Sequence, residues 1–296
     1  MKGVLAYIRY KLAGQLFILP ALVIMIVFIV LPVIWGVIIS FTDMSLVGPK
    51  AMRLDFVGLL NYVKLLTDPD FYNSIRVSFF FTIFSALIGQ AILGLILAIL
   101  LRMRGIKGGG LVALAVFIAW VIPEVVAGYV WGAYASKEGL FNMLLSYLGF
   151  EPVNWLFRRP LETIIIANIW RGTAFSMILF SAALEGIPKF IYEAAEIDGA
   201  SGWQRFRYVT LPLISYAILI DFILITIWTF SVFTMVFVMT GGGPGGATEL
   251  WTIFAYKRSL LPPYEIGYAT AAVNIMFIIV LALIIVYLRL ISKFKI

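Results

Sequence analysis

The stretch EAAEIDGASGWQRFRYVTLPLI, residues 193–214, is a polar segment between two of the most hydrophobic runs of a 296-residue chain. It contains acids, arginines, glycines and a proline, whereas 63% of the whole chain is hydrophobic and only 12% is charged. Soluble domains are about 45–50% apolar and about 25% charged. The chain is therefore expected to be an integral membrane protein that keeps this segment outside the lipid.

Six apolar runs are long enough to cross a bilayer, which takes roughly 20 residues as a helix. Helix is the expected state because backbone groups in lipid must be hydrogen-bonded within the segment, and the runs are too long and unbroken for barrel strands. The predicted fold is all-α, with six transmembrane helices in a single domain over residues 1–296. The expected spans are about 15–41, 77–101, 110–134, 162–184, 212–239 and 267–290.

The orientation follows from the distribution of Lys and Arg, which are in excess on cytoplasmic segments close to membrane spans. More than half of the 22 cations fall on one side of the predicted topology. The N-terminus, the C-terminus and the polar loop are therefore predicted to be cytoplasmic. The cations on that side are Lys2, Arg9, Lys11, Arg102, Arg104, Lys107, Lys189, Arg205, Arg207, Arg289, Lys293 and Lys295.

The composition also excludes several classes of function. The net charge is +7, but the basic residues lie at span ends, so nucleic-acid binding is not expected. There is no Cys and no His, which removes disulfides, thiol or imidazole catalysis and the usual zinc sites, and no metal site is expected. The chain lacks a G-x-x-x-x-G-K-[S/T] phosphate loop, and its run Gly241–Gly246 has no lysine. It is therefore not expected to hydrolyse ATP.

The first part of the polar loop has the pattern of a short amphipathic helix. Pro188 suits the first turn, and Phe190, Ala194 and Ile197 then share one apolar face. Such a helix could anchor the loop to the membrane surface, but anchors carry Lys and Arg on their polar face. An acidic polar face fits a basic protein partner better, and here it carries Glu193, Glu196 and Asp198.

The second part of the loop is expected to form another helix after a glycine break. Gly199 is a natural stop, and Ser201 with Gln204 fits a capping box that starts a second short helix. The fifth span is then expected to begin at Leu211 and Pro212.

The motif E-A-A-x-x-D-G-A at 193–200, followed by Phe206 and by L-P at 211–212, resembles the EAA loop of permeases from binding-protein-dependent ABC transporters. The flanking stretches W-R-G-T-A-F at 170–175 and T-G-G-G-P-G-G-A-T-E at 240–249 are similar to the sugar-permease branch, and the resemblance covers roughly residues 15–290. It implies the type I ABC importer permease fold and a place in the cytoplasmic membrane of a prokaryote.

The resemblance also implies the partners and the coupling residues. The chain would pair with a second permease subunit. In this family the second permease is usually a different chain. Two cytoplasmic ATPase subunits would hold ATP and Mg, an external sugar-binding protein would deliver substrate, and the chain itself would bind no cofactor. The EAA loop would be the coupling helix that enters a cleft of the ATPase, with Glu193 in contact, Ala194 and Ala195 allowing close packing, Asp198 beside them and Gly199 forming the turn.

The implied cargo is a sugar that passes by alternating access. A disaccharide or malto-oligosaccharide such as maltose or trehalose is favoured, with glycerol phosphate left open. Sugars need aromatic faces for their C–H surface and polar groups for their hydroxyls, although each ring could equally face lipid or pack. The residues expected to line the path are Arg171, Gly172, Phe175, Trp228, Thr229 and Val232, and Asp221, Ile225, Trp228 and Val232 share one helical stripe.

Charges within spans are costly and usually face a cavity or a partner. Glu124 and Arg171 could form a buried ion pair, or Arg171 could reach sugar hydroxyls, and the sequence leaves both open. Asp221 could belong to a gate or pair two helices. The spacing Gly128-x-x-x-Gly132 predicts close helix packing.

Two other classes of function fit the sequence less well than the importer. An ion-coupled secondary transporter would usually show repeat symmetry or interrupted helices, and the EAA loop would have no purpose in it. A membrane enzyme would need a catalytic constellation, which is hard to build without His, Cys or paired acids in one span. No catalytic residue is therefore predicted.

Overall fold

The computed structural model describes residues 16–51, 53–102 and 108–293, and in these ranges every regular element is a helix. Five of the described helices are long and apolar enough to cross a membrane, and the number is six if a bent pair, Gly109–Val121 with Glu124–Tyr134, is counted as one span. The predicted all-α class is thereby confirmed. The five unbroken helices are Leu16–Ile39, Pro69–Arg102, Pro160–Glu185, Gly202–Phe230 and Ile266–Leu290.

The chain divides into two compact units, Met1–Thr67 with Ala255–Ile275 and Asp68–Phe254 with Met276–Ile296. The prediction of one transmembrane domain stays a prediction, as does the cytoplasmic position of the termini. Some of the cations that indicated this orientation lie outside the described residues, namely Lys2, Arg9, Lys11, Arg104, Lys107 and Lys295.

In the first unit, the apolar helix Leu16–Ile39 is followed by a loop whose turn is fixed by a buried amide. The Asn61 side chain donates to the carbonyls of Ser40 and Thr42 at 2.9 and 2.8 Å. Only 6% of the apolar window of the long helix is buried, as expected of a span that faces lipid or other membrane helices. The elements of this unit are η1 (Ile26–Val30), α2 (Leu31–Ile39), η2 (Pro49–Ala51), α3 (Leu60–Leu65) and parts of α15 (Trp251–Leu260) and α16 (Ile266–Lys293).

The second unit is built around α10 (Pro160–Glu185). Its neighbours are the π-helical segment η3 (Thr82–Gln90), α5 (Ala91–Arg102), α6 (Gly109–Val121) and α13 (Leu211–Phe230). The remaining elements of this unit are α4 (Pro69–Phe81), α7 (Glu124–Tyr134), α8 (Leu140–Tyr147), α9 (Trp155–Arg158), α11 (Lys189–Ile197), α12 (Gly202–Arg205), η4 (Phe206–Thr210), α14 (Thr234–Thr240) and the other parts of α15 and α16.

Small residues bring the η3–α5 helix against α10. A Cβ added at Gly94 would lie 2.5 Å from the Ser176 Cβ and 2.8 Å from the Met177 nitrogen. Gly128 is similarly close to Val238 of α14, at 2.9 Å for an added Cβ, whereas Gly132 meets no atom within 4 Å. Close backbone approach at small residues is typical of membrane helices. The predicted glycine pair therefore packs closely only at its first member.

Two of the expected spans are interrupted. α6 and α7 meet at 107° because Ile122 and Pro123 are extended; proline has no N–H and disfavours a helical residue before it. Past α13, residues 231–233 are not helical, and α14 starts at Thr234. The expected spans 110–134 and 212–239 are therefore each divided into two helices.

The fifth span begins earlier than the sequence indicated. One helix runs without interruption from Gly202 to Phe230, so the second helix of the polar loop is the first part of the span itself. The π-helical segment η4 directly precedes Leu211 and Pro212. A widened turn is a common way for a helix to accommodate a proline that cannot donate its hydrogen bond.

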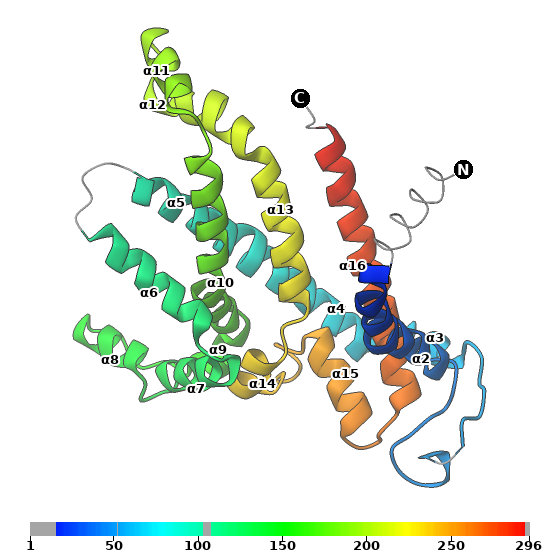
Figure 1. The fold of residues 1–296 in the computed structure, drawn as a ribbon. Coiled ribbons are helices and arrows are strands. Elements are labelled where there is room, and N and C mark those ends of the chain that lie inside the picture. The colour runs from blue at the N-terminus through cyan, green and yellow to red at the C-terminus, as the bar shows by residue number, and fades with distance from the viewer. Residues whose placement is uncertain (1–15, 52, 103–107, 294–296) are drawn as a thin grey trace, which may run out of the picture. The chain divides into compact units, whose positions relative to one another are not determined.

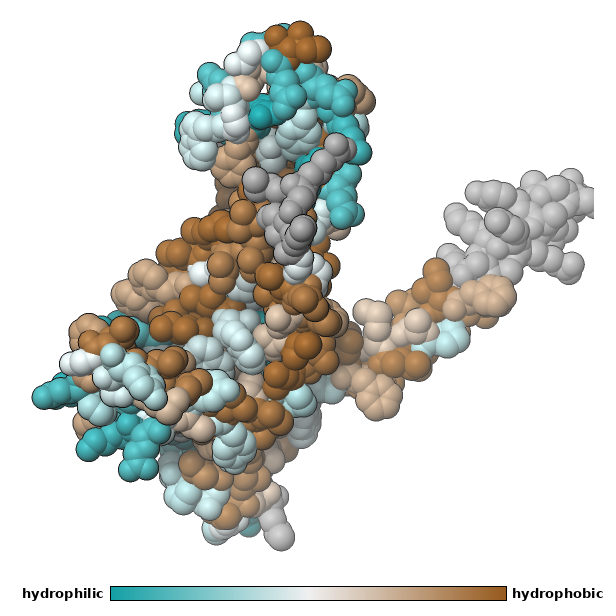
Figure 2. Space-filling view, turned by 90° about the vertical axis from the view of Figure 1, so that its left-hand side faces the viewer, coloured by the Kyte–Doolittle hydropathy of each residue, from teal (hydrophilic) through white to brown (hydrophobic). Residues whose placement is uncertain are grey.

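The polar loop lies at one end of the second unit. α11 and α12 sit together at the end of α10 and α13, while α7 and α14 lie toward the other end (Figure 1). Figure 2 shows hydrophilic side chains, in teal, gathered on this end next to a band of hydrophobic side chains, in brown. The arrangement fits a loop held outside the lipid by helices that cross it.

Candidate functional site

The polar loop folds into a helical hairpin, residues 189–210, called the polar hairpin below. α11 follows Pro188 and ends where Gly199 takes φ +76°, a left-handed conformation that favours glycine. The predicted capping box is confirmed, because the Gln204 N–H donates to Ser201 Oγ at 3.3 Å and the Ser201 N–H donates to Gln204 Oε1 at 2.7 Å. Local signals in the sequence therefore account for the shape of the hairpin.

Tyr192 connects the polar hairpin to the membrane helices. Its hydroxyl accepts a hydrogen bond from Arg102 at the end of α5, at 3.2 Å, and lies 3.0 Å from the Thr210 hydroxyl. The Arg102 guanidinium also lies 4.9 Å from the centre of the Tyr192 ring. Within the hairpin, Glu196 of α11 and Arg205 of α12 form an ion pair. Both helices of the hairpin are thereby tied to each other and to the spans.

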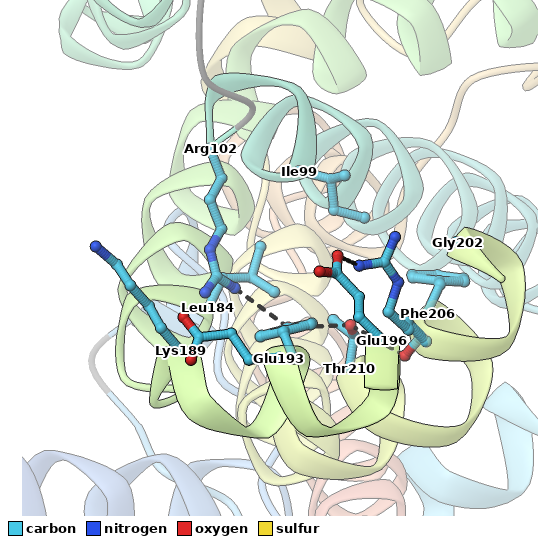
Figure 3. A pocket seen from close by; sticks show the side chains of 11 residues that line it. Ile99, Arg102, Leu184, Lys189, Glu193, Glu196, Gly202, Phe206 and Thr210 are labelled. Atoms are coloured by element: carbon cyan, nitrogen blue, oxygen red, sulfur yellow. Dashed lines mark hydrogen bonds and ion pairs between the residues drawn. The ribbon is translucent and has the colours of Figure 1, made fainter. Parts of the chain in front are cut away.

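A cavity of about 830 Å³ lies beside the polar hairpin. Figure 3 shows Arg102, Lys189 and Glu193 on one side of it and Glu196 on the other. Glu193 has no ion-pair partner within the described part of the chain. Its carboxylate is exposed and free to meet a group from another molecule.

The predicted apolar face of α11 points away from the protein. Phe190 is 66% exposed and Ile197 is 86% exposed, and Ala194 between them is also exposed. The side chains that pack inward are instead Ile191 and Tyr192. An exposed apolar stripe with a polar rim is typical of a protein-interaction surface. The other predicted coupling residues lie at its edges, with Ala195 half-buried and Asp198 and Gly199 exposed.

A second cavity, of about 320 Å³, lies among α10, α13 and the α6–α7 bend and is called the membrane cavity below. The structure brings all of the residues predicted to line the path to this one cavity, together with Glu124. Their roles stay predictions. The predicted lining residues are Arg171, Gly172, Phe175, Trp228, Thr229 and Val232, and Ile225 of the predicted stripe joins them. The residues that sequence reasoning missed are Gln90, Trp120, Asn168 and Ser231.

Aromatic rings form one wall of the membrane cavity. Phe175 and Trp228 meet edge to face, with ring centres 4.6 Å apart, and Trp120 lies 6.2 Å from Phe175. Such rings offer flat apolar surfaces that fit the C–H face of a sugar ring. The expected stripe on the fifth span does not continue to Val232, because α13 ends at Phe230 and Val232 lies in the interruption.

The interruption after α13 leaves carbonyl groups without a partner inside the helix, and a later segment of the chain donates hydrogen bonds to them. The Trp251 indole N–H donates to the Phe230 carbonyl at 2.5 Å, and the Thr252 hydroxyl donates to the Val232 carbonyl at 2.7 Å. Unpaired backbone groups are costly away from water, so these two bonds allow the chain to leave the helix beside the cavity.

An ion pair forms the polar side of the membrane cavity. Arg171 Nη1 lies 3.1 Å from Glu124 Oε1, and both residues also line the cavity. Glu124 reaches this position because the bend at Pro123 makes it the first residue of α7. The two arrangements left open by the sequence are thus compatible, since Arg171 is paired and faces the cavity as well.

Gln90 and Asn168 complete the wall. The Gln90 side chain is 4% exposed and donates to the Asn168 carbonyl at 3.0 Å, and the Asn168 amide donates to Ser85 Oγ at 2.8 Å. A Cβ at Gly172 would overlap the Gln90 carboxamide, so this glycine makes room for it. Gln90 is an amide within an otherwise apolar run, which was the signal in the sequence that could have identified it.

Asp221 lies outside the membrane cavity. It is fully buried, and the Ser176 hydroxyl is 2.9 and 3.0 Å from its two carboxyl oxygens. Since Ser176 belongs to α10 and Asp221 to α13, the contact pairs these two helices, the second of the two roles considered for this residue.

The glycine-rich loop after α14 is a packed turn. Gly241, Gly242, Gly245 and Gly246 all have positive φ. Thr248 is fully buried, and its hydroxyl donates to the Gly243 carbonyl at 2.8 Å. The left-handed backbone conformation accounts for these four glycines.

The chain belongs to the family of binding-protein-dependent transport system inner membrane components, whose family model matches residues 90–295. It is 40% identical to the trehalose/maltose transport system permease protein MalF of Thermococcus litoralis, over 98% of this chain and 97% of that protein. It is 32% identical to the lactose transport system permease protein LacF of Rhizobium radiobacter, over 92% of this chain and 90% of that protein. These matches confirm the family resemblance that was drawn from the EAA motif. They also confirm the prediction of a multi-pass membrane protein.

Solved structures show the same fold. A crystal structure of a bacterial ABC transporter involved in the import of the acidic polysaccharide alginate contains a chain with a TM-score of 0.84 to this one. The sequences are 20% identical, and the similarity covers 99% of each chain. The predicted all-α permease fold is thereby confirmed over nearly the whole chain.

Proposed function

We propose that this chain is the membrane-spanning permease subunit of an ATP-driven importer that moves a sugar, a disaccharide or malto-oligosaccharide, across the cytoplasmic membrane. Family membership supports the importer class. The names of the MalF and LacF relatives support a sugar as cargo. The chain contributes the path, while partner subunits contribute the energy.

The membrane cavity supports the choice of a sugar. It combines the rings of Trp120, Phe175 and Trp228 with amide, hydroxyl and charged groups. Ligand sites for small molecules are typically apolar and aromatic cavities with a few polar groups that fix orientation. In the proposed mechanism this cavity opens alternately to the two sides of the membrane.

The observation that carries the coupling proposal is the outward-facing stripe of the polar hairpin. Phe190 and Ile197 are exposed, and Glu193 beside them has no ion-pair partner in the described structure. An apolar stripe with an acidic neighbour fits a cleft with an apolar floor and a basic rim. We assign this cleft to a cytoplasmic ATPase subunit, and we propose on that basis that the hairpin and both termini are cytoplasmic.

The same assignment defines the complete assembly. Two ATPase subunits bind ATP and Mg, since the chain has no phosphate-binding loop of its own. A second permease, expected to be a different chain, completes the path, and an external sugar-binding protein delivers the cargo. Movement of the ATPase subunits reaches the spans through Tyr192, which joins α11 to α5 and to the start of α13.

An ion-coupled secondary transporter is the second candidate because the helices on both sides of the membrane cavity are interrupted. Interrupted helices of this kind are found at the binding sites of such transporters. The polar hairpin discriminates between the two, because a transporter without an ATPase has no use for a rigid hairpin with an exposed apolar stripe.

Co-purification tests the coupling proposal. The tagged chain is purified gently from its own host, and the proteins bound to it are identified by mass spectrometry for the native chain and for Glu193→Lys. Glu151→Lys is the matched control, since Glu151 is exposed but outside the hairpin. We expect an ATPase subunit and a second permease with the native chain and the control, and loss of the ATPase with Glu193→Lys.

The other outcomes are equally informative. If the native chain comes alone under conditions that preserve other membrane complexes, the importer proposal is wrong and ion-coupled uptake should be assayed. If the ATPase stays bound to Glu193→Lys, the importer proposal stands but the role given to this glutamate is wrong.

A further inference from the structure

We propose that Glu124 sets the charge selectivity of the membrane cavity, so that the cavity accepts neutral sugars and rejects acidic ones. The inference rests on the proposed function, because it names the substrate class of the same cavity. It gives Glu124 a role beyond its ion pair with Arg171.

The charge of the cavity wall depends on one ion pair. Among the described residues that line the cavity, only Glu124 and Arg171 are charged, and they pair at 3.1 Å. Asp221 is the other intramembrane acid of this region, but it is fully buried against Ser176 and does not reach the cavity. The wall is therefore neutral in sum only because Glu124 balances Arg171.

A solute in the cavity can reach both members of the pair. The Arg171 side chain is 22% exposed and the Glu124 side chain is 33% exposed. The ion pair uses one guanidinium nitrogen, Nη1. Because a guanidinium carries five N–H donors, Arg171 keeps donors for a sugar hydroxyl while its charge is balanced.

The position of Glu124 strengthens its effect. It is the first residue of α7, an 11-residue helix, and the N-terminus of a helix carries a partial positive charge. With Glu124 charged, both this helix end and Arg171 are balanced. With Glu124 neutral, both would attract an anion, and a carboxylate in the solute would no longer be repelled by a like charge.

Equilibrium binding to the assembled transporter tests the inference. The complex with its partner subunits is placed in lipid nanodiscs without the external binding protein, which removes that protein's own selectivity. The probes are maltose, trehalose and trehalose with one C6 hydroxymethyl group oxidised to a carboxylate. The measured quantity is the ratio of the Kd for the acidic probe to the Kd for trehalose.

We expect the wild type to prefer the neutral probes and Glu124→Gln to lower this ratio by about tenfold or more, the size of one charge-assisted hydrogen bond. Glu138→Gln is the matched control, since Glu138 is exposed, has the same charge and does not line the cavity; its ratio should stay at the wild-type value. In the double variant Glu124→Gln/Arg171→Gln, the acidic probe should lose the affinity that it gains in Glu124→Gln.

A second variant keeps the test decisive if Glu124→Gln does not assemble. Arg171→Gln leaves the acid unbalanced and should shift preference toward trehalose that carries an amino group. A wild type that prefers the acidic probe, or variants that bind trehalose with unchanged selectivity, would overturn the role of Glu124 and leave the sugar function standing. A wild type that binds neither maltose, trehalose nor the acidic probe would count against the sugar function itself.

Discussion

Replacing Gly172 by alanine should destabilise the second unit through a single neighbour, Gln90. The added methyl would overlap the Gln90 carboxamide, which is 4% exposed and would have to turn into the membrane cavity that it lines. Overpacking costs about 1–3 kcal/mol, and the low end of about 1 kcal/mol applies because only the far end of a flexible side chain must move. The displaced amide also loses its 3.0 Å hydrogen bond to the Asn168 carbonyl, worth about 1 kcal/mol.

The expected loss is therefore about 2 kcal/mol in the free energy of unfolding. For a chain of this size that corresponds to a fall of roughly 4–8 °C in Tm. The assay is thermal unfolding of the purified protein in detergent, followed by intrinsic fluorescence. Gly132→Ala is the matched control because Gly132 is helical and an added Cβ meets nothing within 4 Å. It should leave Tm unchanged or raise it, since alanine favours helix over glycine.

A double variant isolates the cause. Gln90→Ala removes the group that the methyl would strike, so Gly172→Ala should cost much less in that background than in the wild type. The reasoning is refuted if Gly172→Ala melts within about 2 °C of Gly132→Ala, less than the smallest shift estimated above. It is also refuted if Gln90→Ala gives no rescue, because the contact would then not be the source of the loss.

Two further substitutions test other contacts. Tyr192→Phe removes the hydroxyl that joins Arg102 and Thr210, so sugar uptake by reconstituted vesicles should fall while ATP hydrolysis by the complex continues; equal loss of both activities would contradict a linking role. Gly128→Ala places a methyl 2.9 Å from Val238 and should lower stability by about 1–3 kcal/mol, measured as a fall in Tm, and a Tm equal to that of wild type would show that Val238 moves aside freely.

The elements that the sequence predicted well are those whose signals are local. Gly199 and the pair Ser201–Gln204 determine the hairpin from within a few residues, and the apolar runs locate the spans. The interruption after Phe230 was missed because its carbonyls are satisfied by Trp251 and Thr252, more than one helix away along the chain. Pro123 was a local signal for the other bend, but the apolar run around it indicated a continuous helix.

In the candidate sites, too, local signals were found from the sequence and contacts between distant residues were not. Periodicity identified the stripe of Phe190 and Ile197 but could not say whether it faces the protein or a partner, and it faces outward. Arg171 and Trp228 were found because a charge and an aromatic ring stand out in an apolar span. Gln90 was not found, because its role depends on the space that Gly172 leaves on another helix.

The uninterrupted helix from Gly202 to Phe230 has a mechanical consequence. It carries the hairpin at one end and Trp228 near the other, separated by roughly 40 Å at 1.5 Å per residue. A tilt of about 10° about one end would sweep the other through roughly 7 Å over that length. The hairpin is joined to α10 differently, through residues 186–188, which are not helical. A displacement of the hairpin is therefore transmitted more directly to Trp228, on the continuous helix, than to Phe175 on α10.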